Sequence, residues 1–112
     1  MGIFADERTK EIEIEGVRIV LKPLSFGDVS MINSKIKDYA VMGKDGLPEI
    51  SDEGMALYQQ LLILYSIKEW SIKKKINLEN IRRLKPYVAQ RILEVIGEFS
   101  GVDIKNSQTE QD

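Results

Sequence analysis

One stretch decides the fold of this 112-residue chain: SDEGMALYQQLLILYSIKEW, residues 51–70. Leu57, Leu61 and Leu64 recur at helical spacing along it. Ser51, followed at once by two acidic residues, is typical of a helix start, because its hydroxyl can accept a hydrogen bond from a free backbone N–H and the acids suit the positive end of the helix dipole. The apolar run alone would also fit a buried strand, but the length of the periodic segment favours a helix over nearly the whole stretch.

A second side of this helix is apolar as well, since Ala56, Ile63 and Ile67 lie away from the first row. A helix that is apolar nearly all round must be covered by its own domain or by a partner. A short chain has few elements with which to cover every side. We therefore predict a partner-binding surface at Ala56, Ile63, Ile67 and Trp70, although Trp70 fits a core position better than an exposed one.

The composition excludes several function classes. The chain is 43% hydrophobic and 30% charged, has a formal net charge of −2, and contains neither cysteine nor histidine. It thus lacks the usual general base and the commonest metal ligands, and no phosphate-binding loop or nucleophile motif is present. We predict a soluble, non-catalytic protein of the cytoplasm that needs no cofactor and no metal. The longest apolar run is far shorter than the roughly 20 residues that a membrane span needs.

The segment before the central helix predicts a β-hairpin. Residues 10–22 alternate between apolar and polar, and Glu15-Gly16 separates the two halves. With these two residues as the loop, three cross-strand pairs face each other: Ile14 with Val17, Ile12 with Ile19, and Glu13 with Arg18. Apolar pairs then share one face and an ion pair lies on the other, as a half-buried hairpin requires. Because Glu is not ideal at the first loop position of a type I′ turn, a bulged turn is the alternative.

The rest of the chain predicts helices. Ser25 and Asp28 stand at capping-box spacing, Asn77 can cap a short helix, and Pro86 opens a clearly amphipathic one. The predicted fold class is α+β and mainly helical. Its parts are a flexible arm at 1–9, a single domain at 10–101 made of the hairpin at 10–22 and helices at about 26–40, 52–70, 78–84 and 86–99, and a disordered tail at 102–112.

A basic cluster lies between Lys68 and Lys85, where seven basic residues stand against two acidic ones. Its candidate nucleic-acid contacts are Lys73, Lys74, Lys75, Arg82, Arg83 and Lys85. The alternative is a solvated connector followed by the wet face of a short helix. We favour the connector, because no recognition helix or base-stacking platform accompanies the charges.

Several segments together resemble the tail assembly chaperones of long-tailed bacteriophages and prophages. They are the hairpin EIEIEGVRIVL (11–21), the helix start KPLSFGD (22–28), the segment INLENIRRL (76–84), and the final helix ending in FSG (99–101). The resemblance covers roughly residues 10–101, and LSFGD at 24–28 is its most distinctive part.

The resemblance implies a function. Such chaperones bind the tape measure protein, a long apolar helical chain, and keep it soluble in the host cytoplasm until the tail tube forms around it. They are absent from the mature virion, and many also occur as a longer frameshifted product. We therefore expect a protein client, with possible self-association, and we favour it over a nucleic acid as the partner. We expect no membrane and no small-molecule substrate. Two other classes stay open: a small nucleic-acid-binding or regulatory protein, and a structural tail or connector protein of the virion.

Overall fold

The computed structural model describes residues 3–4 and 8–100 and has the predicted α+β fold. The predicted tail, and most of the predicted N-terminal arm, lie outside the described residues. The elements follow in the order β1 (Lys10–Ile14), β2 (Val17–Leu21), α1 (Phe26–Ile36), the 3-10 turn η2 (Lys37–Tyr39), β3 (Ala40–Met42), β4 (Pro48–Ile50), α2 (Asp52–Ser66), β5 (Ile67–Trp70), α3 (Leu78–Arg82) and α4 (Pro86–Ser100).

The N-terminal hairpin is confirmed with its predicted register. Ile12 opposes Ile19, Ile14 opposes Val17, and Glu13 opposes Arg18. The loop residues Glu15 and Gly16 both have positive φ, 52° and 81°, as a two-residue type I′ turn requires. The polar side differs in one respect: Arg18 forms its ion pairs with Glu11 and Glu69, at 3.4 and 3.5 Å, and not with Glu13.

The predicted end of the central helix was wrong. The helix α2 ends at Ser66, and Ile67–Trp70 forms β5, which pairs antiparallel with β2. Ile67 is buried and the next two residues are exposed, so this segment suits a sheet edge as well as a helix. Tertiary context decides, because a two-stranded hairpin alone is marginal and a third strand makes β2 the centre of the sheet β1-β2-β5.

The end of the first helix was also placed too late. Helix α1 stops at Ile36, and after η2 the chain is extended at Ala40–Met42, which pairs with Pro48–Ile50. The residues between these two strands, 43–47, therefore form the turn of a second hairpin, β3–β4. The short helix α3 ends two residues earlier than predicted, whereas α4 and the caps at Ser25, Ser51 and Asn77 agree with the prediction.

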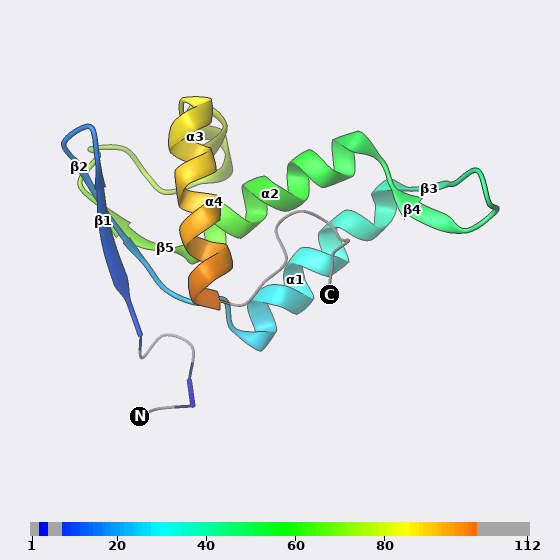
Figure 1. The fold of residues 1–112 in the computed structure, drawn as a ribbon, viewed down its shortest axis with the longest axis horizontal. Helices are drawn as coiled ribbons and strands as arrows, with labels where there is room; N and C mark the ends of the chain where they lie inside the picture. The colour runs from blue at the N-terminus through cyan, green and yellow to red at the C-terminus, as the bar shows by residue number, and fades with distance from the viewer. Residues whose placement is uncertain (1–2, 5–7, 101–112) are drawn as a thin grey trace.

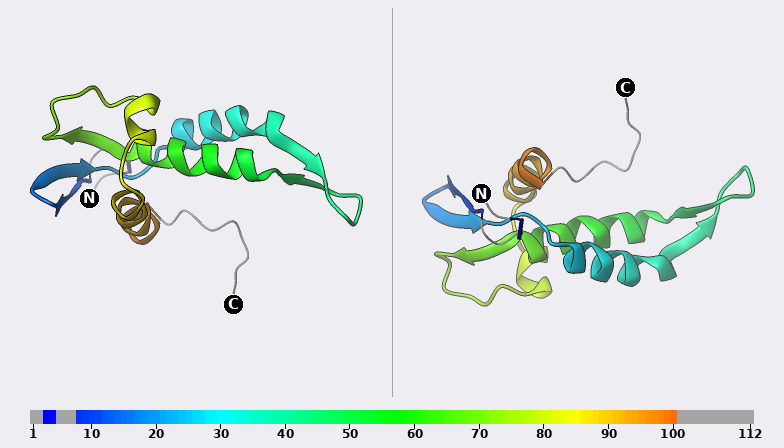
Figure 2. Two further views of the ribbon diagram at one scale, coloured as in Figure 1. Left: turned by 90° about the horizontal axis from the view of Figure 1, so that it is seen from above. Right: turned by 90° about the horizontal axis from the view of Figure 1, so that it is seen from below.

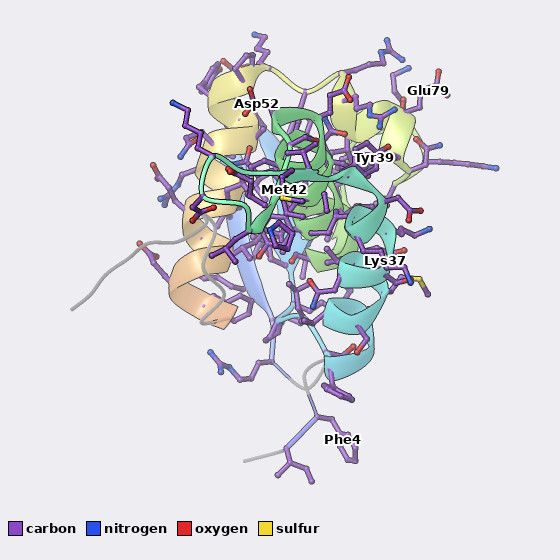
Figure 3. The ribbon with its side chains drawn as sticks, turned by 90° about the vertical axis from the view of Figure 1, so that its right-hand side faces the viewer. Phe4, Lys37, Tyr39, Met42, Asp52 and Glu79 are labelled. Atoms are coloured by element: carbon purple, nitrogen blue, oxygen red, sulfur yellow. The ribbon has the colours of Figure 1, made fainter. Side chains whose placement is uncertain are left out.

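Helix α2 is the element around which the others pack. It contacts α1, α3 and α4, and the last two lie on opposite sides of it (Figures 1 and 2). The sheet lies at one end of the paired helices α1 and α2, and the β3–β4 hairpin projects from the other end, which faces the viewer in Figure 3. The buried core joins β2, the helices and β5: Ile19, Leu21, Ile32, Leu61, Leu62, Ile63, Ile67, Ile81, Ile92, Leu93, Val95 and Ile96.

Lys22, directly after β2, closes the C-terminal end of α2. Its backbone N–H donates to the carbonyl of Ser66, and its ammonium donates to the carbonyl of Tyr65, both at 2.8 Å. The same ammonium lies 3.4 Å from the carboxylate of Asp28, in the first turn of α1. One residue therefore satisfies carbonyls at the end of α2, where a cation is favoured, and ties β2 to both helices.

Gly54, in the first turns of α2, allows the close approach of the β3–β4 hairpin. A Cβ at this position would lie 2.5 Å from the Cβ of Tyr39 and 2.6 Å from a methyl group of Ile50. The backbone N–H of Ser51 also donates to the carbonyl of Tyr39, at 2.9 Å. The base of the hairpin is thus fixed against α2.

We predict that Gly54→Ala lowers the free energy of unfolding by about 2 kcal/mol, because the added methyl group overpacks this contact. Gly27→Ala is the matched control: Gly27 is also helical, and its nearest neighbour would be 3.8 Å away. That change should raise the stability by up to about 1 kcal/mol, as alanine usually does in a helix. Urea unfolding of both variants measures the difference, and a stabilising Gly54→Ala would contradict the close contact.

We also predict that Ser66→Ala stabilises the protein by about 1 kcal/mol, because a buried hydroxyl without a partner costs free energy. Ser66 is fully buried, and its Oγ has no hydrogen-bond partner among the described residues. Ser71→Ala is the control variant. It removes a hydroxyl that accepts a hydrogen bond from the backbone N–H of Arg18 at 2.9 Å, so this variant should unfold at a lower temperature. A lower melting temperature for Ser66→Ala would show that its hydroxyl is bonded.

Candidate functional site

The predicted partner surface is not assembled as expected. Ile63 and Ile67 are only 2% and 5% exposed, because α4 and the sheet enclose this side of α2, whereas Ala56 is exposed. Trp70 is half-buried against the core, and its indole N–H donates to the carbonyl of Lys74 at 2.8 Å. Placing the partner surface at Ile63 and Ile67 was therefore wrong.

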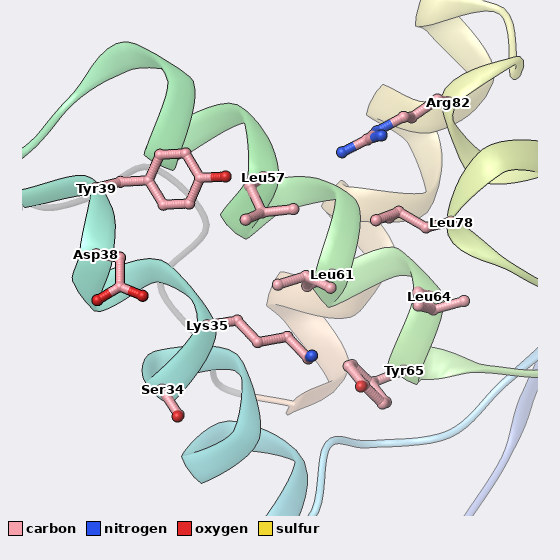
Figure 4. A pocket seen from close by; sticks show the side chains of 10 residues that line it. All are labelled: Ser34, Lys35, Asp38, Tyr39, Leu57, Leu61, Leu64, Tyr65, Leu78 and Arg82. Atoms are coloured by element: carbon pink, nitrogen blue, oxygen red, sulfur yellow. The ribbon is translucent and has the colours of Figure 1, made fainter.

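The opposite side of α2 is the one left open. Between α1, α2 and α3 runs a groove of about 740 Å³, which Figure 4 shows from close by. Its lining residues come from three elements and the turn after α1: Ser34, Lys35, Asp38 and Tyr39 from α1 and η2, Leu57, Leu61, Leu64 and Tyr65 from α2, and Leu78 and Arg82 from α3.

The floor of this groove is an apolar row along α2. Leu57, Leu61 and Leu64 are spaced by four and three residues, so they lie on one face of the helix. Leu61 is buried, whereas Leu57 and Leu64 are half-buried and keep part of their surface open to the groove. The ring of Tyr39 points toward Leu57 at the hairpin end (Figure 4). The floor can therefore accept an apolar stripe of matching spacing.

Charged side chains stand on both walls of the groove. Lys35 extends from α1 toward α2, and Arg82 extends from α3 (Figure 4). The Nε of Arg82 donates to the side-chain oxygen of Gln60 at 2.8 Å, which holds the guanidinium beside the groove. Lys35 forms no hydrogen bond or ion pair with the described residues. With Asp38 on the same wall as Lys35, the walls carry two cations and one anion around an apolar floor.

Sequence reasoning found the leucine row but did not select it as the site. The spacing of Leu57, Leu61 and Leu64 was the correct signal, and the error lay in deciding which side of an all-round apolar helix stays uncovered. That depends on α4, whose strongly amphipathic pattern shows that it packs on something but not on which side of α2.

The six basic side chains of the predicted nucleic-acid patch are all exposed. Several have intramolecular partners: Arg82 bonds Gln60, Arg83 lies 3.5 Å from the side-chain oxygen of Asn80, and Lys85 pairs with Glu15 at 3.3 Å. Lys74 and Arg83 border a small hollow of about 150 Å³ beside Trp70. The six basic residues do not share one helix face, as the contacts of a recognition helix would, because Lys73, Lys74 and Lys75 lie in the connection between β5 and α3.

The described residues show no group of three acidic side chains placed to hold a metal ion. In the same part of the chain, no helix combines the length and apolar character that crossing a bilayer requires.

No family model matches the chain, and neither the search of curated proteins nor the search of solved structures found a match. The groove is the structural feature from which a function can be argued.

We predict that Ile63→Asp unfolds the domain, with a loss of about 4 kcal/mol or more, because it buries a charge without a partner. Ala56→Asp, at another position of the originally predicted surface, should change the stability by no more than about 0.5 kcal/mol, because Ala56 is exposed. Circular dichroism during urea unfolding separates the two variants. A stably folded Ile63→Asp would return that side of α2 to consideration.

Proposed function

We propose that this chain is a non-catalytic binding protein that holds an apolar helical segment of another protein in the groove between α1, α2 and α3. We further propose that it acts as a tail assembly chaperone of a long-tailed phage or prophage, with the tape measure protein as its client. The groove supports the first statement. The second is supported by the sequence resemblance over roughly residues 10–101.

The shape of the groove favours a helical client. Its floor follows the axis of α2, and α1 and α3 form two walls that rise on either side. A helix laid along this floor can insert apolar side chains between Leu57, Leu61 and Leu64, in the way that ridges pack into grooves. An extended segment would place successive side chains on opposite faces and bring only every second one to the floor.

The charges on the walls favour a client helix that carries acidic residues beside its apolar stripe. Lys35 and Arg82 stand on opposite walls, so both flanks of such a helix would meet a cation. Asp38 would meet a basic residue near the hairpin end. These exposed charges contribute orientation and rate of association more than affinity.

An open groove also suits temporary binding. It covers one side of a client helix and shields the apolar stripe from aggregation, while the rest of the helix stays accessible to proteins that must later enclose it. A client held in a closed cavity could not be handed over in this way.

Co-expression with a tape measure fragment tests the proposal. The chain should raise the soluble fraction of that fragment several-fold, and Leu57→Gln should remove most of the effect, because it places an amide on the groove floor. The soluble fraction is measured by densitometry after centrifugation of the lysate.

Leu84→Gln is the matched control. Leu84 is also a half-buried leucine packed against the core, but it lies outside the groove. Both variants should lose similar stability in urea, and only Leu57→Gln should lose the client. Equal loss of the client in both would contradict the groove. A designed amphipathic peptide with acidic flanks separates the two statements: if it binds and the tape measure fragment does not, the groove stands and the phage assignment fails.

A further inference from the structure

The charges of this chain are separated along the axis of α2. Residues 37–53, which form η2, the β3–β4 hairpin and the start of α2, contain five acidic and two basic residues, a net charge of −3. The basic cluster at 68–85, which includes β5 and α3, contains seven basic and two acidic residues, a net charge of +5. The hairpin and β5 lie at opposite ends of α2 (Figure 1). The molecule therefore has a negative hairpin end and a positive sheet end.

Neighbouring elements do not cancel these two charges. Residues 10–22 contain three basic and three acidic residues, and residues 54–67 contain none of either kind. Within the described part of the chain, Lys85 is the only basic residue of the cluster that forms an ion pair, with Glu15 at 3.3 Å. In the same part, no acidic residue of 37–53 forms one. The groove along α2 therefore lies between two ends of opposite charge.

The side chains on the groove walls follow the same order. Helix α1 runs toward the hairpin, so Asp38 lies nearer to the hairpin than Lys35 does. The ammonium of Lys35 is directed toward Tyr65, at the sheet end of the groove (Figure 4). Arg82 is bonded to Gln60, in the second half of α2, at 2.8 Å. A helix in the groove would thus meet an anion at the hairpin end and two cations closer to the sheet.

The backbone dipoles of the two longer groove helices do not favour either direction. Helices α1 and α2 are antiparallel neighbours, so the positive end of each lies beside the negative end of the other (Figure 1). Their dipoles largely cancel. The charged side chains are therefore the feature that distinguishes one end of the groove from the other.

We propose that the groove selects a client helix whose charge changes sign along its length, and binds it with the basic half toward the hairpin and the acidic half toward the sheet. This inference rests on the proposed function, because it specifies the helix that the groove holds. Complementary charges of this kind fix the orientation of a bound partner more than they raise its affinity. The apolar floor supplies the affinity, and the wall and end charges supply the direction.

Two designed amphipathic peptides, each mixed with the full chain, test the proposal. Both have the same leucine stripe. The first carries lysines in its N-terminal half and glutamates in its C-terminal half, and the second has these charges exchanged. A nitroxide on the N-terminus of each peptide broadens the amide NMR signals of nearby residues. The first peptide should broaden hairpin residues 40–50, and the second should broaden Ile67–Trp70, because its charges require the opposite direction.

Exchanging two charges on one wall tests the role of the groove residues. Lys35 and Asp38 are both exposed, so the double variant Lys35→Asp, Asp38→Lys should fold normally. It should lower the directional preference of the first peptide several-fold, measured as the ratio of broadening at the hairpin to broadening at β5. The matched control, Arg91→Glu with Glu94→Arg, exchanges an exposed pair with the same spacing on α4 and should leave the ratio unchanged.

Salt provides a second check. In 1 M sodium chloride the screening length falls to about 3 Å, so the preference should disappear while the leucine stripe still binds. A preference that persists at this salt concentration would show that the shape of the groove, and not its charge, sets the direction.

Other results overturn the proposal in distinguishable ways. If both peptides broaden the same end of the groove, the charges do not set the direction, although binding in the groove stands. The same conclusion follows if the α4 exchange lowers the ratio as much as the α1 exchange. If neither peptide binds, the groove and the proposed function fail together. If signals change only in the connection 71–77, the acidic half binds the basic cluster outside the groove.

Discussion

The end of α2 at Ser66 is the constraint on which the rest of the structure depends. A longer helix would leave β2 with one neighbour. Lys22 pairs with the carbonyls of Tyr65 and Ser66 through its ammonium and its backbone N–H, so the chain can leave the helix without leaving these two carbonyls unpaired. The residues that follow, Ile67–Trp70, then become the third strand of the sheet. This junction ties the sheet to the C-terminal end of α2.

A helix that is apolar on nearly all sides needs other elements to cover each side. In this chain they cover three sides of α2 and leave part of its surface open. Helix α4 and the sheet bury Ile63 and Ile67, while α1 and α3 cover two further sides but leave a gap between them. The groove is thus a direct result of the short length of α3, which spans Leu78–Arg82 and cannot cover the whole of α2. The groove floor and the buried core thus lie on different faces of the same helix, α2.

Local signals predicted the parts of the fold that local physics determines. The alternation around Glu15-Gly16 gave the correct hairpin register, and the capping residues located the helix starts. The helix end at Ile36 was missed because Ala40–Met42 forms a hairpin with Pro48–Ile50, and the end at Ser66 was missed because Ile67–Trp70 pairs with β2, which is distant in the sequence. The site was missed for the same reason: the sequence of α2 shows which of its sides are apolar, and only the packing of α4 shows which one is hidden.

Trp70 has a consequence for spectroscopy. It is the single tryptophan of the chain, and it lies in β5 at the sheet end, with its indole bonded to the basic connector. Tyr39 and Tyr65, by contrast, line the groove. Fluorescence excited selectively in the indole therefore reports on the sheet end of the molecule, without any added label.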